Sequence, residues 1–413
     1  MNDRVASRAQ RSQIGQMADV RYARDAQEWM DRFADRTGLT SGRPPRRYLW
    51  TDAFAVCSFL GLERAIGDGR HLELAIRLVD QVHHTLGRYR AGDVRSGWLS
   101  GLGEQEGEAH PTRGGLRIGK RLPERRPDEP FDDRLEWERD GQYFHYLTKW
   151  MHALDQVTRA TGHPTFNTWA RVLAEAAHHA FTYGPSGSGR RMYWKMSIDL
   201  SRPLVSSMGQ HDPLDGFVTY TELDATARVT GAVASGPDLA AEAADFFAMT
   251  VRGGLATPDP LGLGGLLADA FCVDQLRWQN ALPSGEQLLG DLLEAALAGL
   301  RQYVQQPDLR SSAESRLAFR ELGLAIGLAA VERMAERAAS APERSAATVD
   351  AAARVAPLMR YLPLRREIES FWLEPGHRRA ETWLEHEDIN EVMLATSLAP
   401  DGFLSPITWS PKR

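Results

Sequence analysis

Histidine and carboxylate side chains stand directly in front of a long apolar segment in the stretch GQHDPLDGFVTY, residues 209–220. The stretch contains His211, Asp212 and Asp215. Imidazole and carboxyl groups often transfer protons in enzymes, because their pKa values can be brought near neutral pH. Such groups cost stability beside a buried helix unless they are paired or used. The stretch therefore predicts either acid–base chemistry or helix capping. The pattern of similar residues elsewhere in the chain distinguishes between these two interpretations.

Residues of the same types precede five other helical segments. They are Trp50 and Asp52; Glu136, Trp137, Glu138 and Asp140; Asp259; Glu314 and Arg316; and Glu385, His386, Glu387 and Asp388. Capping explains any one of these carboxylates, because Asp and Glu stabilise helix N-termini. Their recurrence, with Tyr143, His145 and Tyr146 following the second group, favours a binding site. Aromatic rings stack on apolar sugar faces and carboxylates bind hydroxyls, so the pattern predicts a sugar site.

The elements that must position these residues are pairs of helices. Residues 50–87 read as two helices around a Gly-Asp-Gly turn. Nearly every position from Ala53 to Leu62 is small or apolar, which indicates a helix buried on all sides. The following helix has only one apolar stripe, which includes Leu72, Ile76 and Val79. The first helix is therefore expected to be inner and the second outer.

This pair of helices recurs along the chain. Further pairs are predicted over residues 141–181, 215–254, 261–304 and 314–371, and a last inner helix over 386–398. The amphipathic segment 18–35 is expected to pack outside that last helix and to close a ring. The resulting prediction is an all-α, single-domain (α/α)6 barrel over residues 1–413, with six inner and six outer helices. An open helical solenoid and a two-domain helical bundle are the alternatives.

Two long insertions interrupt the repeat, at about residues 88–139 and 183–210. The first is rich in Gly, Pro, Arg and Glu, and the second is expected to carry a short β-segment at 191–198. Long loops inside a compact domain are usually functional or disordered. Their aromatic content, and the way each leads into an inner helix, predicts a functional role at one end of the barrel.

Composition narrows the possible partners. The 413 residues carry a net charge of −6 with mixed signs, which argues against nucleic-acid binding. Residues 1–20 lack the apolar core of a signal peptide, and no window reaches the ~20 apolar residues of a membrane span. We therefore expect a soluble cytoplasmic protein with a small-molecule saccharide substrate and no nucleic-acid or membrane partner. The oligomeric state stays open.

Metal and cofactor motifs are weak. Cys57 and Cys272 lie in separate apolar runs, which predicts two buried thiols and no disulfide. HEDIN, residues 386–390, begins like a zinc-protease motif but has Asn390 where the second histidine is required. GGLRIGK, residues 114–120, lacks the Ser or Thr that follows the lysine of a phosphate-binding loop. No metal and no cofactor are therefore expected.

At this point the chain resembles the six-hairpin glycosidase superfamily, the (α/α)6-barrel glycoside hydrolases and related sugar epimerases. The resemblance covers nearly all of the chain through its helix alternation and rests on YLWTD, ERDGQYFHY, HDPLDG and WLEHEDIN, each at an inner helix. It implies a glycoside hydrolase. In many such enzymes one carboxylic acid protonates the departing oxygen and a second carboxylate, roughly 6.5–9.5 Å away, activates water with inversion.

Residue roles follow from this resemblance as expectations. Asp140 is the expected general acid and Glu387 the expected base, with Asp212 and Asp388 as the reserve acid and base. The expected substrate-binding residues are Trp50, Asp52, Trp137, Tyr143, His145, Trp194, Lys195, His211, Asp215 and His386.

Two other functions remain open. A sugar epimerase or isomerase would use histidines such as His145, His211 and His386 as proton shuttles. A non-catalytic carbohydrate-binding protein would use the same hollow without turnover. The arginines Arg113 and Arg117 could reach an acidic sugar, so the choice between neutral and anionic substrates is also open.

Overall fold

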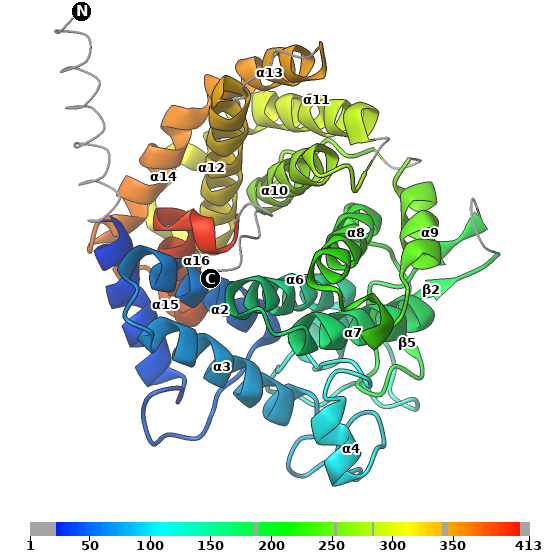
Figure 1. Ribbon diagram of the computed structural model, residues 1–413. Helices are drawn as coiled ribbons and strands as arrows, with labels where there is room; N and C mark the ends of the chain where they lie inside the picture. The colour runs from blue at the N-terminus through cyan, green and yellow to red at the C-terminus, as the bar shows by residue number, and fades with distance from the viewer. Residues whose placement is uncertain (1–21, 186–188, 252–253, 283–284, 341–345, 405–413) are drawn as a thin grey trace, which may run out of the picture.

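Helices alternate between an inner and an outer ring in the computed structural model, which describes residues 22–185, 189–251, 254–282, 285–340 and 346–404 (Figure 1). The inner ring consists of α2 (Leu49–Ile66), α6 (Phe144–Thr161), α8 (Asp212–Thr230), α10 (Pro260–Trp278), α12 (Ala318–Ser340) and α16 (Glu387–Leu398). The outer ring consists of a helix over 22–36, α3 (Arg70–Leu86), α7 (Thr165–Phe181), α9 (Ala240–Thr250), α11 (Gly285–Tyr303), α13 (Ala346–Met359) and α14 (Leu362–Leu373). The predicted all-α fold of paired inner and outer helices is confirmed.

The ring closes between the first and last inner helices. Each inner helix packs on the next, and α16 returns to pack on α2. The helix over 22–36 contacts this closure from outside: Arg36 pairs with Asp388 at 2.6 Å, and the rings of Trp29 and Trp383 lie 6.3 Å apart. The expected closing helix is therefore in place over its described part, and an open solenoid is excluded.

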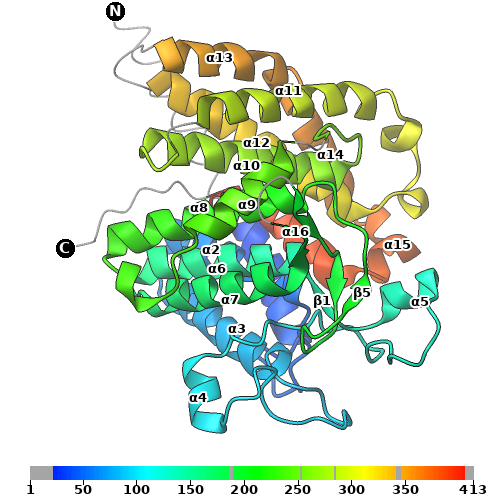
Figure 2. The same cartoon turned by 90° about the vertical axis from the view of Figure 1, so that its right-hand side faces the viewer.

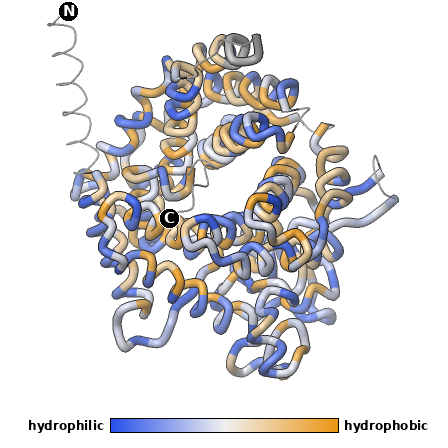
Figure 3. The backbone as a smooth tube through the Cα atoms, in the orientation of Figure 1, coloured by the Kyte–Doolittle hydropathy of each residue, from blue (hydrophilic) through white to orange (hydrophobic). Residues whose placement is uncertain are grey.

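Inner helices bury more of their residues than outer helices do, as their apolar patterns predict. In α2 every residue from Leu49 to Leu62 is buried, whereas α3 buries mainly one stripe. Hydrophilic positions nevertheless interrupt the inner helices α8 and α10 (Figure 3). Four of these positions, Asp212, Asp215 and Glu222 of α8 and Asp269 of α10, are buried, so part of the barrel interior is polar.

Two inner helices cross at glycines. A Cβ on Gly264 of α10 would lie 2.1 Å from the carbonyl oxygen of Gly323 of α12, and one on Gly327 would lie 2.7 Å from the Cα of Gly264. The backbones of α10 and α12 can approach this closely only because these positions carry no side chain.

Gly264→Ala is expected to lower the free energy of unfolding by about 1–3 kcal/mol, because the two helices must separate to admit the methyl group. Gly265→Ala is the matched control, since a Cβ there meets no atom within 4 Å. Replacing a helical glycine without a clash stabilises by about 0.4–1 kcal/mol. Urea unfolding of both variants measures the difference, and equal stabilities would contradict the close crossing.

Figure 2 shows α5 (Asp133–Glu138) and the strands β1 (Gln142–Tyr143) and β5 (Pro203–Val205) at the end of the barrel where the inner helices begin, whereas α4 (Glu104–Ala109) lies beside the outer helices α3 and α7. The first insertion contains α4 and α5. The second contains β3 (Arg191–Met192), β4 (Lys195–Met196) and β5. The short strand predicted over 191–198 is thus present as two strands, β3 and β4, which belong to different sheets. β4 pairs antiparallel with both β5 and β1 (Gln142–Tyr143), and β3 pairs with β2 (Thr182–Tyr183). This pairing holds the second insertion against the start of α6.

The last described residues close the other end of the barrel. After α16 a short turn, Pro400–Gly402, packs on α2. The Phe403 ring then stacks on Phe54 at 4.5 Å.

A further short helix, α15 (Glu381–Leu384), precedes α16. Among the helices that the structure describes, none has the length and apolar character needed to cross a membrane.

Candidate active site

A cavity of about 280 Å³ lies inside the inner ring. Residues of all six inner helices line it, together with Trp194 from the second insertion and Phe403 and Leu404 at the closed end. Besides the thiol of Cys272, its titratable lining residues are His145, Lys149, His152, His211, Asp212, Asp215, Glu222, Asp259 and Asp269. The cavity therefore combines a dense set of acids and bases with apolar walls, which is the usual character of a small-molecule site.

Asp212 is the first residue of α8, directly before Pro213, and it is 5% exposed. Its Oδ2 atom has no hydrogen-bond partner among the described residues, and its Oδ1 atom lies 3.8 Å from Nδ1 of His145. Burial, with the nearby Asp215 charge as a smaller cause, raises the pKa of Asp212 to about 7. A carboxyl group with this pKa holds a proton for a substantial part of the time at neutral pH, so it can donate one.

Asp215 lies one helical turn after Asp212 on α8, and its pKa is shifted in the opposite direction. Its Oδ1 accepts a hydrogen bond from Nζ of Lys149 at 3.2 Å. Burial alone would raise the pKa of Asp215, but the Lys149 ammonium and a hydrogen bond with Asp269 bring it below its usual range. Asp215 is therefore ionised where Asp212 is protonated, and two groups whose pKa values are pushed apart are natural acid and base partners.

Asp269 of α10 completes this group. Its Oδ2 atom has no N–H or O–H donor among the described residues, and its carboxyl group contacts the carboxyl group of Asp215. Burial, and then the Asp215 charge, raise the pKa of Asp269 well above its usual range. A contact between two carboxyl groups requires a shared proton, so Asp215 and Asp269 form a singly protonated pair beside Lys149.

A second polar group lies deeper in the barrel. Nδ1 of His152 lies 2.8 Å from Glu222, and Arg159 pairs with Glu222 at 3.2 Å and with Asp155 at 2.7 Å. His152 also donates through Nε2 to the carbonyl oxygen of Phe403 at 3.0 Å. All of these acids are paired, so this group holds the closed end of the barrel together.

Aromatic rings form a band at the open end. His145 stacks on Tyr143 with ring centroids 5.4 Å apart, and Tyr143 and Trp137 both contact Trp194, at 5.3 and 4.7 Å. Trp50 of α2 extends the band through contacts with Tyr146 at 6.5 Å and Phe319 at 6.4 Å. The His386 ring joins it through Phe319 at 5.5 Å. The band offers flat surfaces for a sugar ring at the mouth of the cavity.

Six of the residues predicted from the sequence line the cavity. They are Trp50, His145, Trp194, His211, Asp212 and Asp215. Trp137, Tyr143 and His386 belong to the aromatic band but not to the lining. The sequence interpretation missed Lys149, His152, Glu222 and Asp269. Polar residues at helical spacing gave a usable signal, since 145, 149 and 152 form one stripe and 215, 219 and 222 another.

The expected acid–base pair is not at the cavity. Asp140 is fully buried, accepts a hydrogen bond from Arg117 at 2.9 Å and another from the backbone N–H of Gly119 at 2.9 Å. Glu387 and the reserve base Asp388 instead pair with Arg36, at 3.4 and 2.6 Å. None of these three carboxylates is among the lining residues. Their geometry indicates structural roles, in fixing the first insertion and in closing the ring.

Two other expected binding residues are also committed to internal pairs. Asp52 accepts a hydrogen bond from the backbone N–H of Tyr48 at 2.9 Å and pairs with Arg47 at 3.3 Å. Lys195 is fully buried and pairs with Glu136 at 2.9 Å. Neither side chain lines the cavity, because each is used to anchor a loop at the open end.

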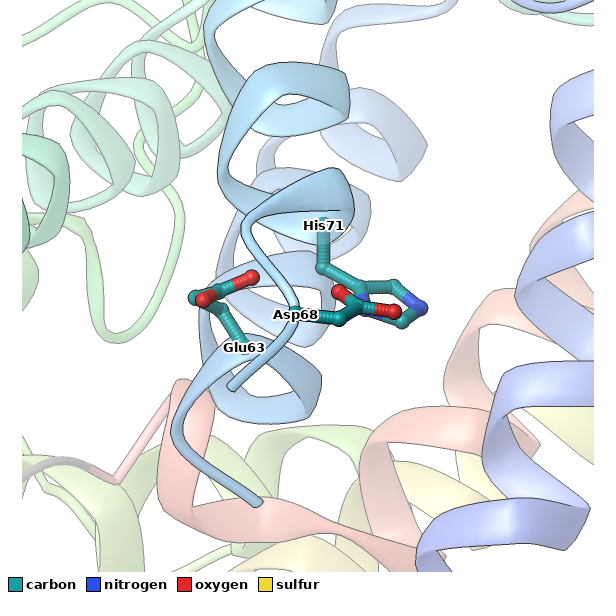
Figure 4. Close-up of side chains that lie close together, drawn as sticks. All are labelled: Glu63, Asp68 and His71. Atoms are coloured by element: carbon teal, nitrogen blue, oxygen red, sulfur yellow. The ribbon is translucent and has the colours of Figure 1, made fainter. Parts of the chain in front are cut away.

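One group outside the cavity has a composition suited to a metal. Figure 4 shows Glu63, Asp68 and His71 at the turn between α2 and α3, with candidate ligand atoms within 4.8 Å of one another. Glu63 already accepts hydrogen bonds from the backbone N–H groups of Gly69 and Leu72, at 3.0 and 3.3 Å. Asp68 accepts one from Arg70 at 3.0 Å. We interpret this group as the cap of α3, because its carboxylates satisfy the first N–H groups of that helix.

Comparisons with known proteins assign no activity. No protein-family model matches the chain, and no curated protein matches it. One similar solved structure is described as the crystal structure of a sugar epimerase from a ruminal bacterium. It is 13% identical in sequence, covers 76% of this chain and 75% of its own, and superposes with a TM-score of 0.41. The function must therefore be inferred from the side chains of the cavity.

Proposed function

We propose that the chain is a carbohydrate-active enzyme of the six-hairpin type that hydrolyses a glycosidic bond of a small saccharide or glycoconjugate. The observation that carries the proposal is the pair formed by Asp212 and Asp215. Both are buried on one face of α8 and line the cavity, and their pKa values are shifted in opposite directions. This pair replaces Asp140 and Glu387 as the proposed acid and base.

The proposed reaction balances with these two groups and one water. Asp212 gives its proton to the glycosidic oxygen as the bond between that oxygen and the anomeric carbon breaks. Water attacks the anomeric carbon, and its proton passes to Asp215. The products are two sugars, one with a new reducing end. Asp215 then loses its proton to solvent and Asp212 takes one up, which restores the starting state.

The lining also supports a sugar ligand. Oδ2 of Asp212 and Nδ1 of His145 lack hydrogen-bond partners among the described residues, although both atoms are shielded from solvent. Buried polar atoms without partners are costly, and sugar hydroxyl groups can satisfy both because a hydroxyl donates and accepts. Trp50 and Trp194 supply the apolar faces on which a sugar ring can stack.

A specific observation also favours epimerisation as a second candidate. Burial lowers the pKa of His145 to about 4, so its ring is neutral and can accept a proton at physiological pH. His211 donates through Nε2 to the carbonyl oxygen of Leu255 at 2.8 Å, which leaves its Nδ1 as the basic nitrogen. His145 and His211, both on the cavity lining, could remove and return a proton at a carbon next to a carbonyl group.

One experiment separates the two reactions. The full chain is incubated in heavy water with a panel of reducing sugars, methyl glycosides and short oligosaccharides, and products are followed by NMR. Hydrolysis is expected to create new reducing ends without placing deuterium on carbon. Deuterium on a carbon-bound position, with no new reducing end, would instead establish epimerisation. Absence of both across the panel would contradict an enzymatic role on sugars.

A further inference from the structure

The charges around the cavity are unevenly distributed. Five acids line it: Asp212, Asp215 and Glu222 from α8, and Asp259 and Asp269 before and within α10. Lys149 is the one lining lysine, and no arginine is part of the described lining. A ligand that enters this space therefore meets many more carboxyl groups than cations.

The cations nearest to the cavity are already paired. Lys149 donates to Asp215 at 3.2 Å, and Arg159 pairs with Glu222 at 3.2 Å. At the open end, Arg320 pairs with Asp259 at 2.6 Å. A carboxylate therefore lies beside each of these cations, so an anionic ligand that approaches one of them also meets a negative charge.

Of the three lining histidines, His145 is uncharged, and His211 and His152 already contact acceptors. His145 is neutral because burial lowers its pKa to about 4. His211 uses Nε2 on the carbonyl oxygen of Leu255, and both ring nitrogens of His152 face acceptors, Glu222 and the carbonyl oxygen of Phe403. The atoms left open include Oδ2 of Asp212 and Oδ2 of Asp269, and a carboxyl group keeps the capacity to accept a hydrogen bond from a hydroxyl or ammonium group even when it is protonated.

The arginines that the sequence offered for an acidic sugar lie elsewhere. Arg117 donates to Asp140 at 2.9 Å and to the carbonyl oxygens of Thr85 and Arg88, at 2.8 and 3.0 Å. Neither Arg117 nor Arg113 is among the lining residues. The choice between neutral and anionic substrates, which the sequence left open, is thus one that the charge distribution can answer.

We propose that the cavity selects neutral and amino-bearing sugars and rejects sugars that carry a carboxylate, phosphate or sulfate. This selectivity rests on the proposed function, since it assumes that the cavity binds a sugar. Hydroxyl and ammonium groups can donate to the open carboxyl oxygens of Asp212 and Asp269, whereas an anion finds only paired cations and further acids. At the mouth of the cavity, the ion pair of Asp259 with Arg320 determines the local charge.

The test measures binding to the full chain by calorimetry at pH 7.5. In each of several stereochemical series, the neutral methyl glycoside is compared with its amino and uronic acid counterparts and with the sugar phosphate. In every series that binds, the uronic acid and the phosphate are expected to bind at least about tenfold more weakly than the neutral sugar. Equal or tighter binding of the anionic members would overturn the selectivity and leave the proposed function standing.

Asp259→Asn provides a positive test of the same inference. Asparagine can still cap α10, but it no longer neutralises Arg320, so anionic sugars are expected to gain about tenfold relative to neutral ones. Asp31→Asn is the matched control, because it frees Arg70 from an exposed pair outside the cavity. If the ratio of the affinities for neutral and anionic sugars is the same in Asp259→Asn as in the wild type, the charge argument is overturned. Selective binding without turnover would support the inference and contradict hydrolysis, and absence of binding in every series would overturn both.

Discussion

Asp212→Asn is expected to lower kcat by about 10²–10⁴-fold, because the variant cannot donate a proton to the departing oxygen. The fold should survive the change, since asparagine has nearly the same shape and Oδ2 of Asp212 forms no hydrogen bond within the described structure. The measurement is turnover of whichever saccharide the wild-type chain processes, under saturating conditions. A variant with more than a third of wild-type kcat would remove Asp212 from the catalytic machinery.

Stability distinguishes this loss from misfolding. The folded chain holds a proton on Asp212 up to about pH 7, whereas an unfolded aspartate loses it near pH 4, so this group makes the wild type less stable as pH rises between these values. Asp212→Asn lacks this penalty. Its stability relative to wild type should therefore increase from pH 5 to pH 8, by on the order of 1 kcal/mol or more. Wild-type activity should fall as pH rises through about 7, where the acid gives up its proton.

Asp140→Asn is the matched control for the catalytic assignment. Asp140 is the carboxylate that local sequence pattern singled out, but it is buried against Arg117 outside the cavity lining. The substitution should destabilise the chain, since it leaves the buried guanidinium without its carboxylate, and should leave kcat of the folded fraction within a few-fold of wild type. A large loss of kcat with unchanged stability would return Asp140 to the active site.

Arg159→Met is expected to produce the largest loss of stability, about 3–5 kcal/mol. Its side chain is 7% exposed, and it neutralises two buried carboxylates, Asp155 at 2.7 Å and Glu222 at 3.2 Å. Without the guanidinium these acids must be buried with less compensation or take up protons. The loss should therefore be larger at pH 8 than at pH 5, as measured by urea unfolding at both values.

Arg333→Met is the corresponding surface control. Arg333 pairs with Asp401 at 2.9 Å, but the two side chains are 33% and 57% exposed. Exposed pairs of this kind contribute about 0–1 kcal/mol. Equal losses in the two variants, or a loss in Arg159→Met that does not depend on pH, would contradict the buried network at the closed end.

The architecture could be predicted from the sequence because the apolar pattern of each helix indicates how much of that helix is buried. Uninterrupted apolar runs such as 53–62 are buried on all sides, and one-sided stripes such as that of α3 cover only one face, so inner and outer helices could be told apart locally. The closing helix was expected because segment 18–35 is amphipathic and precedes the first inner helix. These inferences depend on the spacing of apolar residues along one helix, which can be counted in the sequence.

The site was less predictable because its decisive contacts join distant positions. Arg36 neutralises Asp388 across 352 residues and Arg117 neutralises Asp140 across 23, and nothing near either aspartate indicates that it is already paired. His211, Asp212 and Asp215 were found because they begin a helix whose end faces the cavity. Lys149 and Asp269 lie within helices, where a single polar residue resembles an ordinary exposed position until the ring is assembled.

The central claim is that chemistry takes place in the barrel cavity beside Asp212 and Asp215. A structure of the full-length Asp212→Asn chain with its bound saccharide tests this most directly. The account predicts a sugar ring between Trp50 and Trp194, with the scissile oxygen within hydrogen-bond distance of residue 212 and a hydroxyl on Nδ1 of His145. A saccharide bound instead beside Asp140 or Glu387, with the cavity free of sugar, would contradict it.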